Sequence, residues 1–378
     1  MKKILVITHR SYPVIGGIES HVYRYCKYIS SHKFPLDVDL DITNLSYSPE
    51  SDKVTAINKN FRIITFRTKF IISKSYPILS PRALYMTLKY VLKYKPDVIH
   101  THNRYMISTW LGIIVAKVLG IKVIHTEHAS NWNNFDNKGL TFLSKCLDLT
   151  LIKFLLMLCN KITVVSLASK NFLKNKLSLR KDIDIIENFI DTNEIDKILR
   201  SGIKTKIPQG TRNVLFAGRL VETKGYRDFI KFIRESNLGS NIKFIVVGDG
   251  PGEKEIVDIS NQPNVIYLGA LPYREMISTM SQCSIILNLS LLEGYSTTLL
   301  EAMYLKKKIV STNINANKEV LRSYPLKEFI DVHPTSKMLE NALIEISKHT
   351  KDDSVFPESL RIRLAETALK YFKAYNIE

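Results

Sequence analysis

The chain of 378 residues has few cysteines, and their spacing does not indicate a metal centre or a disulfide framework. The four cysteines are Cys26, Cys146, Cys159 and Cys283, and no two of them form a CxxC pair. Structural zinc sites and small disulfide-rich domains both depend on closely spaced cysteines. The cysteine pattern therefore argues against both classes of protein, and we expect no bound metal.

Long apolar runs are also missing. The run from Ile4 to Ile7 is too short for the apolar region of a signal peptide and is typical of a first buried strand. The most apolar segment, residues 140–159, is interrupted by Lys145, Asp148 and Lys153. Charged residues at these positions are costly inside a bilayer. This segment therefore predicts a buried or interfacial helix.

Acidic residues are absent from residues 53–96, whereas ten residues of this stretch are Lys or Arg. The whole chain has a formal net charge of +18, and residues 1–190 carry 28 basic and 13 acidic side chains. Aromatic and aliphatic residues alternate with the basic ones, a mixture that suits an anionic membrane surface. Nucleic acid is disfavoured because zinc-finger spacing, an RNP-like motif and a clear recognition helix are all lacking. A solvated basic face without a partner is the alternative.

The length suggests two domains, and the hydrophobic pattern indicates the same α/β architecture in both. Short apolar strands alternate with helical patterns, which favours doubly wound parallel sheets. We expect strands at 4–8, 37–43, 61–67, 97–100, 123–126 and 162–165, and after a polar segment at 199–212 again at 214–217, 243–247, 265–268, 284–289 and 308–311. We place the domains at 1–190 and 191–357, with a C-terminal helix in 358–378 that packs back on the first.

One segment of the second domain combines a strand, a glycine-containing loop and a helix. Glu293 and Glu301 stand eight positions apart, with Tyr295 to Thr298 between them. Loop amides and hydroxyls at a helix start suit a phosphate. A carboxylate instead accepts hydrogen bonds from sugar hydroxyls, so a nucleotide sugar would use both features. The alternative is that both glutamates are solvated acids favoured by the helix dipole.

Two further segments add groups that suit a diphosphate. Arg219 and Lys224 follow the strand at 214–217, where a guanidinium and an ammonium would balance two negative charges in place of a metal ion. The pair Gly16-Gly17 lies between the first strand and its helix and would let backbone approach a ligand closely. It is not a GxGxxG pattern, so it does not indicate a dinucleotide-binding protein.

Several short motifs follow one another in the second half: GRL at 218–220, KG at 224–225, VGDGP at 247–251, LG at 268–269, EG at 293–294 and EAM at 301–303. With Gly16-Gly17-Ile18-Glu19 and the segment from Asn188 to Asp191, this ordered set resembles the retaining GT-B glycosyltransferases of the group 1, glycogen-synthase-like type (family 4). The resemblance covers nearly the whole chain. It implies two Rossmann-like domains facing across a cleft.

The resemblance implies roles for individual residues. Glu293 would bind sugar hydroxyls and orient the anomeric carbon, and Glu301 would hold the ribose. Arg219 and Lys224 would stabilise the departing diphosphate, and Tyr295, Ser296, Thr297 and Thr298 would contact the phosphates.

The remaining implied contacts come from other loops. Gly16 and Gly17 would close on the donor from the N-terminal domain, and Leu271 would lie near the base. His128 matches the family's N-domain active-site histidine by its position at a strand end, with His125 as the competitor.

The implied activity is the transfer of a sugar, with retention of configuration, from a nucleotide diphosphate sugar to a glycan acceptor. UDP-sugars are the commonest donors in the family, and no metal cofactor is expected. The implied acceptor is lipid-linked, in surface polysaccharide synthesis, and the implied location is cytoplasmic and peripheral to the membrane.

Two alternatives remain open, a nucleotide-sugar epimerase of the same architecture and a non-catalytic nucleotide- or glycan-binding protein. The family usually has glycine and proline where this chain has Lys306 to Lys308, which supports the second alternative.

Overall fold

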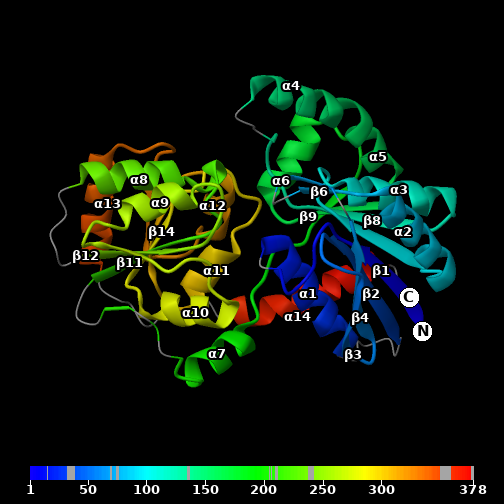
Figure 1. Cartoon of the computed structure of the whole chain (residues 1–378), viewed down its shortest axis with the longest axis horizontal. Coiled ribbons are helices and arrows are strands. Elements are labelled where there is room, and N and C mark those ends of the chain that lie inside the picture. The colour runs from blue at the N-terminus through cyan, green and yellow to red at the C-terminus, as the bar shows by residue number, and fades with distance from the viewer. Residues whose placement is uncertain are drawn as a thin grey trace. The chain divides into compact units, whose positions relative to one another are not determined.

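The structure is a computed structural model of the whole chain. It describes residues 1–14, 16–31, 39–68, 70–73, 76–133, 137–203, 205, 207–208, 212–236, 242–349 and 359–375. The chain divides into two compact units (Figure 1). The first contains Met1–Asn188 with Leu364–Glu378, and the second contains Phe189–Arg363. Each unit has its own sheet and its own core, so each is described separately.

The first unit is built on an eight-stranded sheet with the order β10-β9-β8-β7-β1-β2-β4-β3. Neighbouring strands are parallel, except that β3 runs antiparallel to β4. The order reverses direction between β1 and β7, which makes the carboxyl ends of these strands a switch point. The strands are β1 (Lys2–Ile7), β2 (Leu40–Ser48), β3 (Lys53–Asn58), β4 (Phe61–Arg67), β7 (Val98–His102), β8 (Lys122–Glu127), β9 (Lys161–Val164) and β10 (Ile183–Ile185).

Helices of the first unit connect these strands. They are α1 (Gly17–Ser31), α2 (Pro81–Tyr94), α3 (Ile107–Val118), α4 (Lys138–Leu147), the π-helical turn η1 (Asp148–Ile152), α5 (Lys153–Leu158), α6 (Leu167–Asn171), the π-helical turn η2 (Phe172–Lys176) and α14 (Ser359–Ala374), whose residues from Leu364 belong to this unit. A small hairpin pairs β5 (Phe70–Ser73) with β6 (Tyr76–Ile78). The basic helix α2 begins at Pro81, and the side chain of Ser80 caps it by accepting a hydrogen bond from the amide of Ala83.

The single helix expected over residues 140–159 is divided in the structure into α4, η1 and α5. The segment begins at Lys138, where the side chain of Asn137 accepts hydrogen bonds from the amides of Gly139 and Leu140. The π-helical turn η1 then separates α4 from α5, and both Asp148 and Ile152 in this turn are buried. One extra residue per turn rotates the helix, so the inward-facing positions before and after η1 do not follow a single period.

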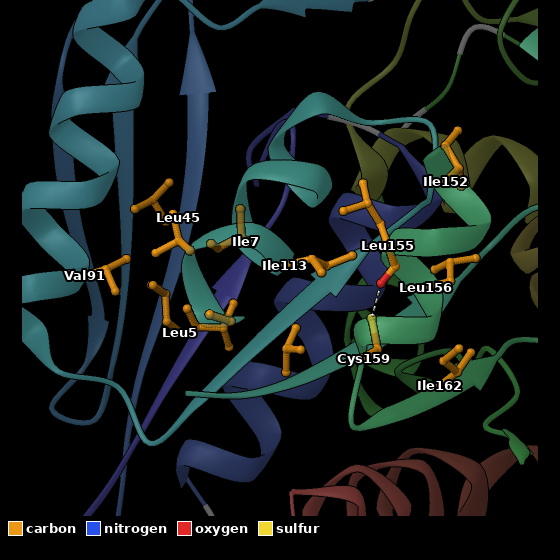
Figure 2. Packing of buried hydrophobic residues seen from close by; sticks show 14 of the residues in the cluster. Leu5, Ile7, Leu45, Val91, Ile113, Ile152, Leu155, Leu156, Cys159 and Ile162 are labelled. Atoms are coloured by element: carbon orange, nitrogen blue, oxygen red, sulfur yellow. Dashed lines mark hydrogen bonds between the residues drawn. The ribbon is translucent and has the colours of Figure 1, made fainter. Parts of the chain in front are cut away.

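The core of the first unit packs α3 and α5 against the strands (Figure 2). Leu5, Ile7 and Ile113 are fully buried, and Leu155 and Leu156 of α5 lie in the same cluster. Burial on both faces of the sheet explains why β1 contains the continuous apolar run from Ile4 to Ile7.

The second unit is a six-stranded, all-parallel sheet with the order β13-β12-β11-β14-β15-β16. This is a doubly wound sheet whose switch point lies between β11 and β14. Phe216 of β11 stacks on Phe229 of the following helix with a ring-centroid distance of 4.7 Å. The strands are β11 (Arg212–Ala217), β12 (Ile242–Val247), β13 (Val265–Tyr267), β14 (Ile285–Asn288), β15 (Lys308–Thr312) and β16 (Lys327–Ile330).

The helices of the second unit are α7 (Thr192–Arg200), the 3-10 turn η3 (Glu222–Lys224), α8 (Tyr226–Glu235), α9 (Glu253–Ile259), α10 (Tyr273–Gln282), α11 (Thr297–Tyr304), α12 (Asn315–Val320) and α13 (Ser336–Lys348). β16 and α13 were not predicted from the sequence. Within the described ranges, no helix has both the length and the apolar character needed to cross a bilayer.

Candidate active site

Two loops meet at the switch point of the second sheet. β11 and β14 are parallel neighbours, with Phe216 paired to Leu287, so their carboxyl ends lie at the same edge. β11 leads into Gly218 and the turn η3, and β14 leads into the loop that contains Glu293. In open α/β sheets, ligands bind at this edge and at this point of the strand order.

The backbone holds these two loops together. The amide of Leu291 donates to the carbonyl of Thr223 at 2.9 Å. Gly225 has a φ of 72°, and a Cβ atom there would lie 2.1 Å from the carbonyl oxygen of Leu289. Only glycine permits this approach at a positive φ. The KG pair at 224–225 therefore positions the lysine opposite the loop after β14.

The side chains of Lys224 and Glu293 form an ion pair across the two loops. Ser290 donates a hydrogen bond from its hydroxyl to the same oxygen of Glu293, at 2.8 Å. The side chains of Lys224 and Glu293 are 27% and 11% exposed, so the pair is largely withdrawn from water. The carboxylate therefore has a fixed orientation before any ligand binds, and the ammonium faces the edge where an anion would arrive.

A second layer of polar side chains supports this loop. The amide of Ser290 donates to Oδ1 of Asn288 at 3.1 Å, and the carbonyl of Ser290 accepts from the hydroxyl of Thr312. The buried side chain of Asn317 donates in turn to Oγ1 of Thr312, at 3.2 Å. The sequence did not indicate this network.

The glutamate loop continues into α11, which contains the other residues expected to contact the donor. Ser296 is the N-cap of α11, but its hydroxyl makes no capping hydrogen bond. Thr297 and Thr298 open the helix, and Glu301 follows on it as a buried side chain. Tyr295 is buried and accepts a hydrogen bond from Arg363 at 2.9 Å. Its hydroxyl is therefore engaged within the second unit, and its contact with a phosphate remains a prediction.

The other donor-side residues lie on adjacent loops. Arg219 follows Gly218 and its side chain is exposed. The amide of Leu220 donates to the carbonyl of Asp249 at 2.7 Å, and that of Gly248 donates to Gly269 at 2.9 Å. These bonds tie together the loops that follow β11, β12 and β13. The half-buried Leu271, two residues after Gly269, therefore lies in the same group of loops.

In the first unit, His128 follows the last residue of β8. Its Nε2 atom lies 3.0 Å from Nδ1 of His102, and its ring centroid lies 5.4 Å from that of His21. Burial, together with the charge of His125, lowers the pKa of His128 to about 4, although Glu127 opposes the shift. The imidazole is therefore neutral near pH 7.

His125, the competing candidate, lies within β8 and is fully buried. Its Nδ1 atom lies 3.0 Å from the hydroxyl of Thr101, and its Nε2 lies 3.5 Å from Glu127. Both ring nitrogens are thus used within the fold. His128 at the strand end remains the better candidate, and its role remains a prediction.

A buried ion pair fixes the loop that contains His128. Glu127 accepts hydrogen bonds from the amides of His128 and Ala129, at 2.9 and 2.7 Å, and lies 3.3 Å from the guanidinium of Arg104. Burial alone would raise the pKa of Glu127, but Arg104, His125 and the backbone amides lower it to about 2. Arg104 was not predicted as a site residue. The one indication in the sequence was its position two residues after β7.

Gly16 and Gly17 lie at the start of α1. A Cβ atom on Gly17 would meet nothing within 4 Å, so this backbone is open. Their contribution to donor binding remains a prediction. In the described part of the chain, no group of three or more His, Cys, Asp or Glu side chains is arranged to hold a metal ion.

Two family models match the chain. The model described as Glycosyltransferase Family 4 matches residues 15–194, and the model described as Glycosyl transferases group 1 matches residues 200–363. An uncharacterized glycosyltransferase of Methanocaldococcus jannaschii is 27% identical over 85% of this chain and 84% of its own length. An Escherichia coli UDP-Gal:alpha-D-GlcNAc-diphosphoundecaprenol alpha-1,3-galactosyltransferase is 23% identical over 99% of this chain and 94% of its own.

Solved structures show the same fold. The sucrose-phosphate synthase of Thermosynechococcus elongatus superposes with a TM-score of 0.73 at 15% identity, over 100% of this chain and 98% of its own. The chain belongs to the glycosyltransferases of the group 1, family 4 type and has their GT-B fold.

Proposed function

We propose that this glycosyltransferase transfers a sugar from a nucleotide diphosphate donor, a UDP-sugar, with retention of anomeric configuration. The acceptor is a lipid-linked glycan in surface polysaccharide synthesis, and the enzyme works at the cytoplasmic face of a membrane. The observation that carries the donor proposal is the pair of Lys224 and Glu293, oriented by Ser290 at the switch point of the second sheet. It offers a cation and a fixed hydrogen-bond acceptor at one ligand-binding edge.

Donor binding would exchange the partners of this pair. The diphosphate attracts Lys224 and the exposed Arg219, and the amides at the start of α11 add the positive end of a helix dipole. Glu293 then accepts hydrogen bonds from sugar hydroxyls, which orients the anomeric carbon. Glu301, one turn inside α11, holds the ribose hydroxyls. Leu271 lies beside the base, which rests on the group of loops after β11, β12 and β13.

In the transfer step, the bond between the anomeric carbon and the β-phosphate oxygen breaks. The acceptor hydroxyl attacks the oxocarbenium-like carbon from the same face, and its proton passes to the departing phosphate. The protein supplies charge and position and no nucleophile. Lys224 and Arg219 take up the charge that grows on the diphosphate. For His128 we propose the role of the family's N-domain active-site histidine, with an imidazole that burial keeps neutral.

The acceptor proposal draws on the Escherichia coli relative, whose name gives GlcNAc-diphosphoundecaprenol as its acceptor. It also draws on α2, where Tyr85, Leu88 and Leu92 are exposed large hydrophobic side chains on a helix that also carries Lys89 and Lys93. This mixture suits an anionic lipid surface. Lys69, Lys74 and Ser75 of the basic stretch lie outside the described residues.

The lysines at 306–308 have a structural explanation that weakens the non-catalytic alternative. Lys306 has a φ of 52°, the left-handed conformation that a glycine adopts easily at a helix end. Lys308 donates from its ammonium to the carbonyl of Ser347 at 2.8 Å, and Lys307 donates to the carbonyl of Ser281. The chain therefore makes the turn at the end of α11 with a lysine in the left-handed conformation.

A donor screen tests the proposal. The purified protein is mixed with UDP-, GDP- and ADP-sugars, with and without EDTA, and thermal stability and donor hydrolysis are measured. We expect one UDP-sugar to raise the melting temperature and to be slowly hydrolysed to UDP, equally in EDTA. The anomeric configuration of the released or transferred sugar is compared with that of the donor, and the same configuration indicates retention. Stabilisation by nucleotides with no turnover, even with lipid-linked acceptors, would overturn the transferase proposal in favour of a binding protein.

A further inference from the structure

The helical segment formed by α4, η1 and α5 exposes an unusual number of large apolar side chains. Phe142 is 70% exposed and Phe154 is 58% exposed. No residue of α4 is buried. Large apolar side chains that are at least two-fifths exposed on this segment are Leu140, Phe142, Leu143, Leu149, Leu151, Phe154 and Met157. We call this set the α4–α5 face. Apolar patches of this size on a protein surface mark a binding surface.

The inward side of the same segment is already accounted for. Ile152, Leu155 and Leu156 are 1–3% exposed and belong to the core of the first unit. Figure 2 shows Leu155 and Leu156 on α5 with other side chains of this core around them. The segment is thus apolar on two sides, and the fold buries only one of them. The α4–α5 face still lacks a partner within the described part of its own unit.

The charges of the segment point to an anionic partner. Three lysines, Lys138, Lys145 and Lys153, are spaced along it, and none of the three is buried. Asp148 is the only acidic residue between 138 and 158, and its side chain is 0% exposed. It turns inward, where it accepts hydrogen bonds from Arg104 at 3.0 Å and from Tyr105 at 2.8 Å. The charged groups on the outward surface of this segment are therefore all cations.

We propose that the α4–α5 face docks on an anionic lipid bilayer. The apolar side chains enter the boundary between headgroups and acyl chains, and the lysines extend to the phosphates. A second copy of the chain fits less well, because two such faces would bring lysines of the same sign together. A helix of ten residues with no buried side chain is also marginal in water, and a bilayer would supply the burial that α4 lacks.

The inference rests on the proposed function for its purpose, since a bilayer surface is where a lipid-linked acceptor would be found. It adds a specific docking surface, apart from the basic stretch at 53–96, and this surface is argued from its own residues. The two proposals can fail independently. Docking is measured on vesicles that contain no acceptor lipid, and donor hydrolysis is measured in solution.

The test compares two triple variants of the full chain. Leu140→Ser, Phe142→Ser and Leu143→Ser together remove the apolar side chains of α4. Val257→Ser, Met338→Ser and Ile344→Ser together remove three exposed apolar side chains of the second unit, at 38–47% exposure, and serve as the matched control. Binding to vesicles of phosphatidylglycerol and phosphatidylcholine is measured by co-sedimentation.

We expect the wild type and the control to bind alike, and the α4 variant to bind at least about tenfold more weakly. Its melting temperature and donor hydrolysis should match the wild type, because no residue of α4 is buried. Lys138→Gln with Lys145→Gln should weaken binding to these vesicles by about fivefold per lysine at low salt. The same pair should have little effect on vesicles of phosphatidylcholine alone.

Two results would overturn the proposal. One is wild-type vesicle binding by the α4 variant. The other is a wild type that does not bind vesicles but dimerises in solution, with a monomeric α4 variant, which would assign the face to a second copy. Vesicle binding that needs the α4–α5 face, in a protein that hydrolyses no donor, would leave the docking surface standing and remove the proposed function.

Discussion

Lys224 and Glu293 lie 69 positions apart in the chain, yet their side chains form an ion pair at the switch point of the second sheet. The contact depends on Gly225, whose lack of a side chain lets the turn η3 pack against Leu289. Each residue neutralises the other while no donor is bound. A diphosphate would compete for Lys224, and the release of Glu293 would then be coupled to donor binding.

Replacement of Lys224 tests this coupling. Lys224→Gln removes a charged donor from the diphosphate, so we expect the affinity for UDP to fall about 10- to 100-fold. Isothermal titration measures it. Lys254→Gln is the matched control, because Lys254 is an exposed lysine on α9 of the same unit. Equal UDP affinity in the Lys224 variant and the wild type would remove Lys224 from the donor site.

The turn at Lys306, after α11, leads to a prediction about stability. A residue with a side chain in the left-handed conformation costs about 1–2 kcal/mol, and glycine recovers this at an entropic cost of roughly 0.5–1 kcal/mol. Lys306→Gly should therefore raise the free energy of unfolding by up to about 1 kcal/mol, measured by urea denaturation. Lys307→Gly, at a position without a positive φ, should lower it. Clear destabilisation by Lys306→Gly would contradict the view that Lys306 occupies a backbone position suited to glycine.

The buried histidines of the first unit make a pH prediction. Burial, the largest cause, lowers the pKa of His100 and His102 well below 6.5 and that of His128 to about 4. Between these values and 6.5 the unfolded chain binds more protons than the folded one. Stability is therefore complete above pH 6.5 and declines as the pH falls toward 4. For His128 alone, the full shift corresponds to at most about 3 kcal/mol.

Urea unfolding at pH 7.5, 6 and 5 measures this slope. The range stays above 4.5, the ordinary pKa of Glu127, so the lowered pKa of that carboxylate contributes almost nothing there. His128→Gln should flatten the slope. If the free energy of unfolding of the wild type did not change with pH, these histidines would not be held neutral by the fold.

The strand positions were accessible from the sequence because buried strands are short, apolar and bounded by glycine or polar residues. The expected strand at 61–67 coincides with β4, and β11 to β15 overlap the expected runs of the second half. The motif from Glu293 to Glu301 was recognisable for a similar reason, since strand, loop and helix are adjacent in the chain. β16 was not predicted because it begins with Lys327 and Glu328 and so lacks an apolar pattern.

Contacts between side chains of different loops could not be predicted from the sequence. Nothing in the period of β7 and β8 indicates that His102 and His128 face each other at 3.0 Å, or that Arg104 lies against Glu127. Thr312 reaches Ser290 in the loop of Glu293 because β15 is the neighbour of β14, and the sequence does not indicate this strand order. The segment 138–158 is apolar on more than one side, so periodicity could not separate its core side from the α4–α5 face.

The most direct test of the account is the behaviour of Glu293→Gln with the donor found in the screen. The variant keeps the shape of the side chain but weakens it as an acceptor of sugar hydroxyls and releases Lys224. We therefore expect UDP to bind as tightly as to the wild type or more tightly, while donor turnover falls about 100-fold or more. Turnover equal to that of the wild type would contradict the assignment of Glu293 as the residue that orients the sugar.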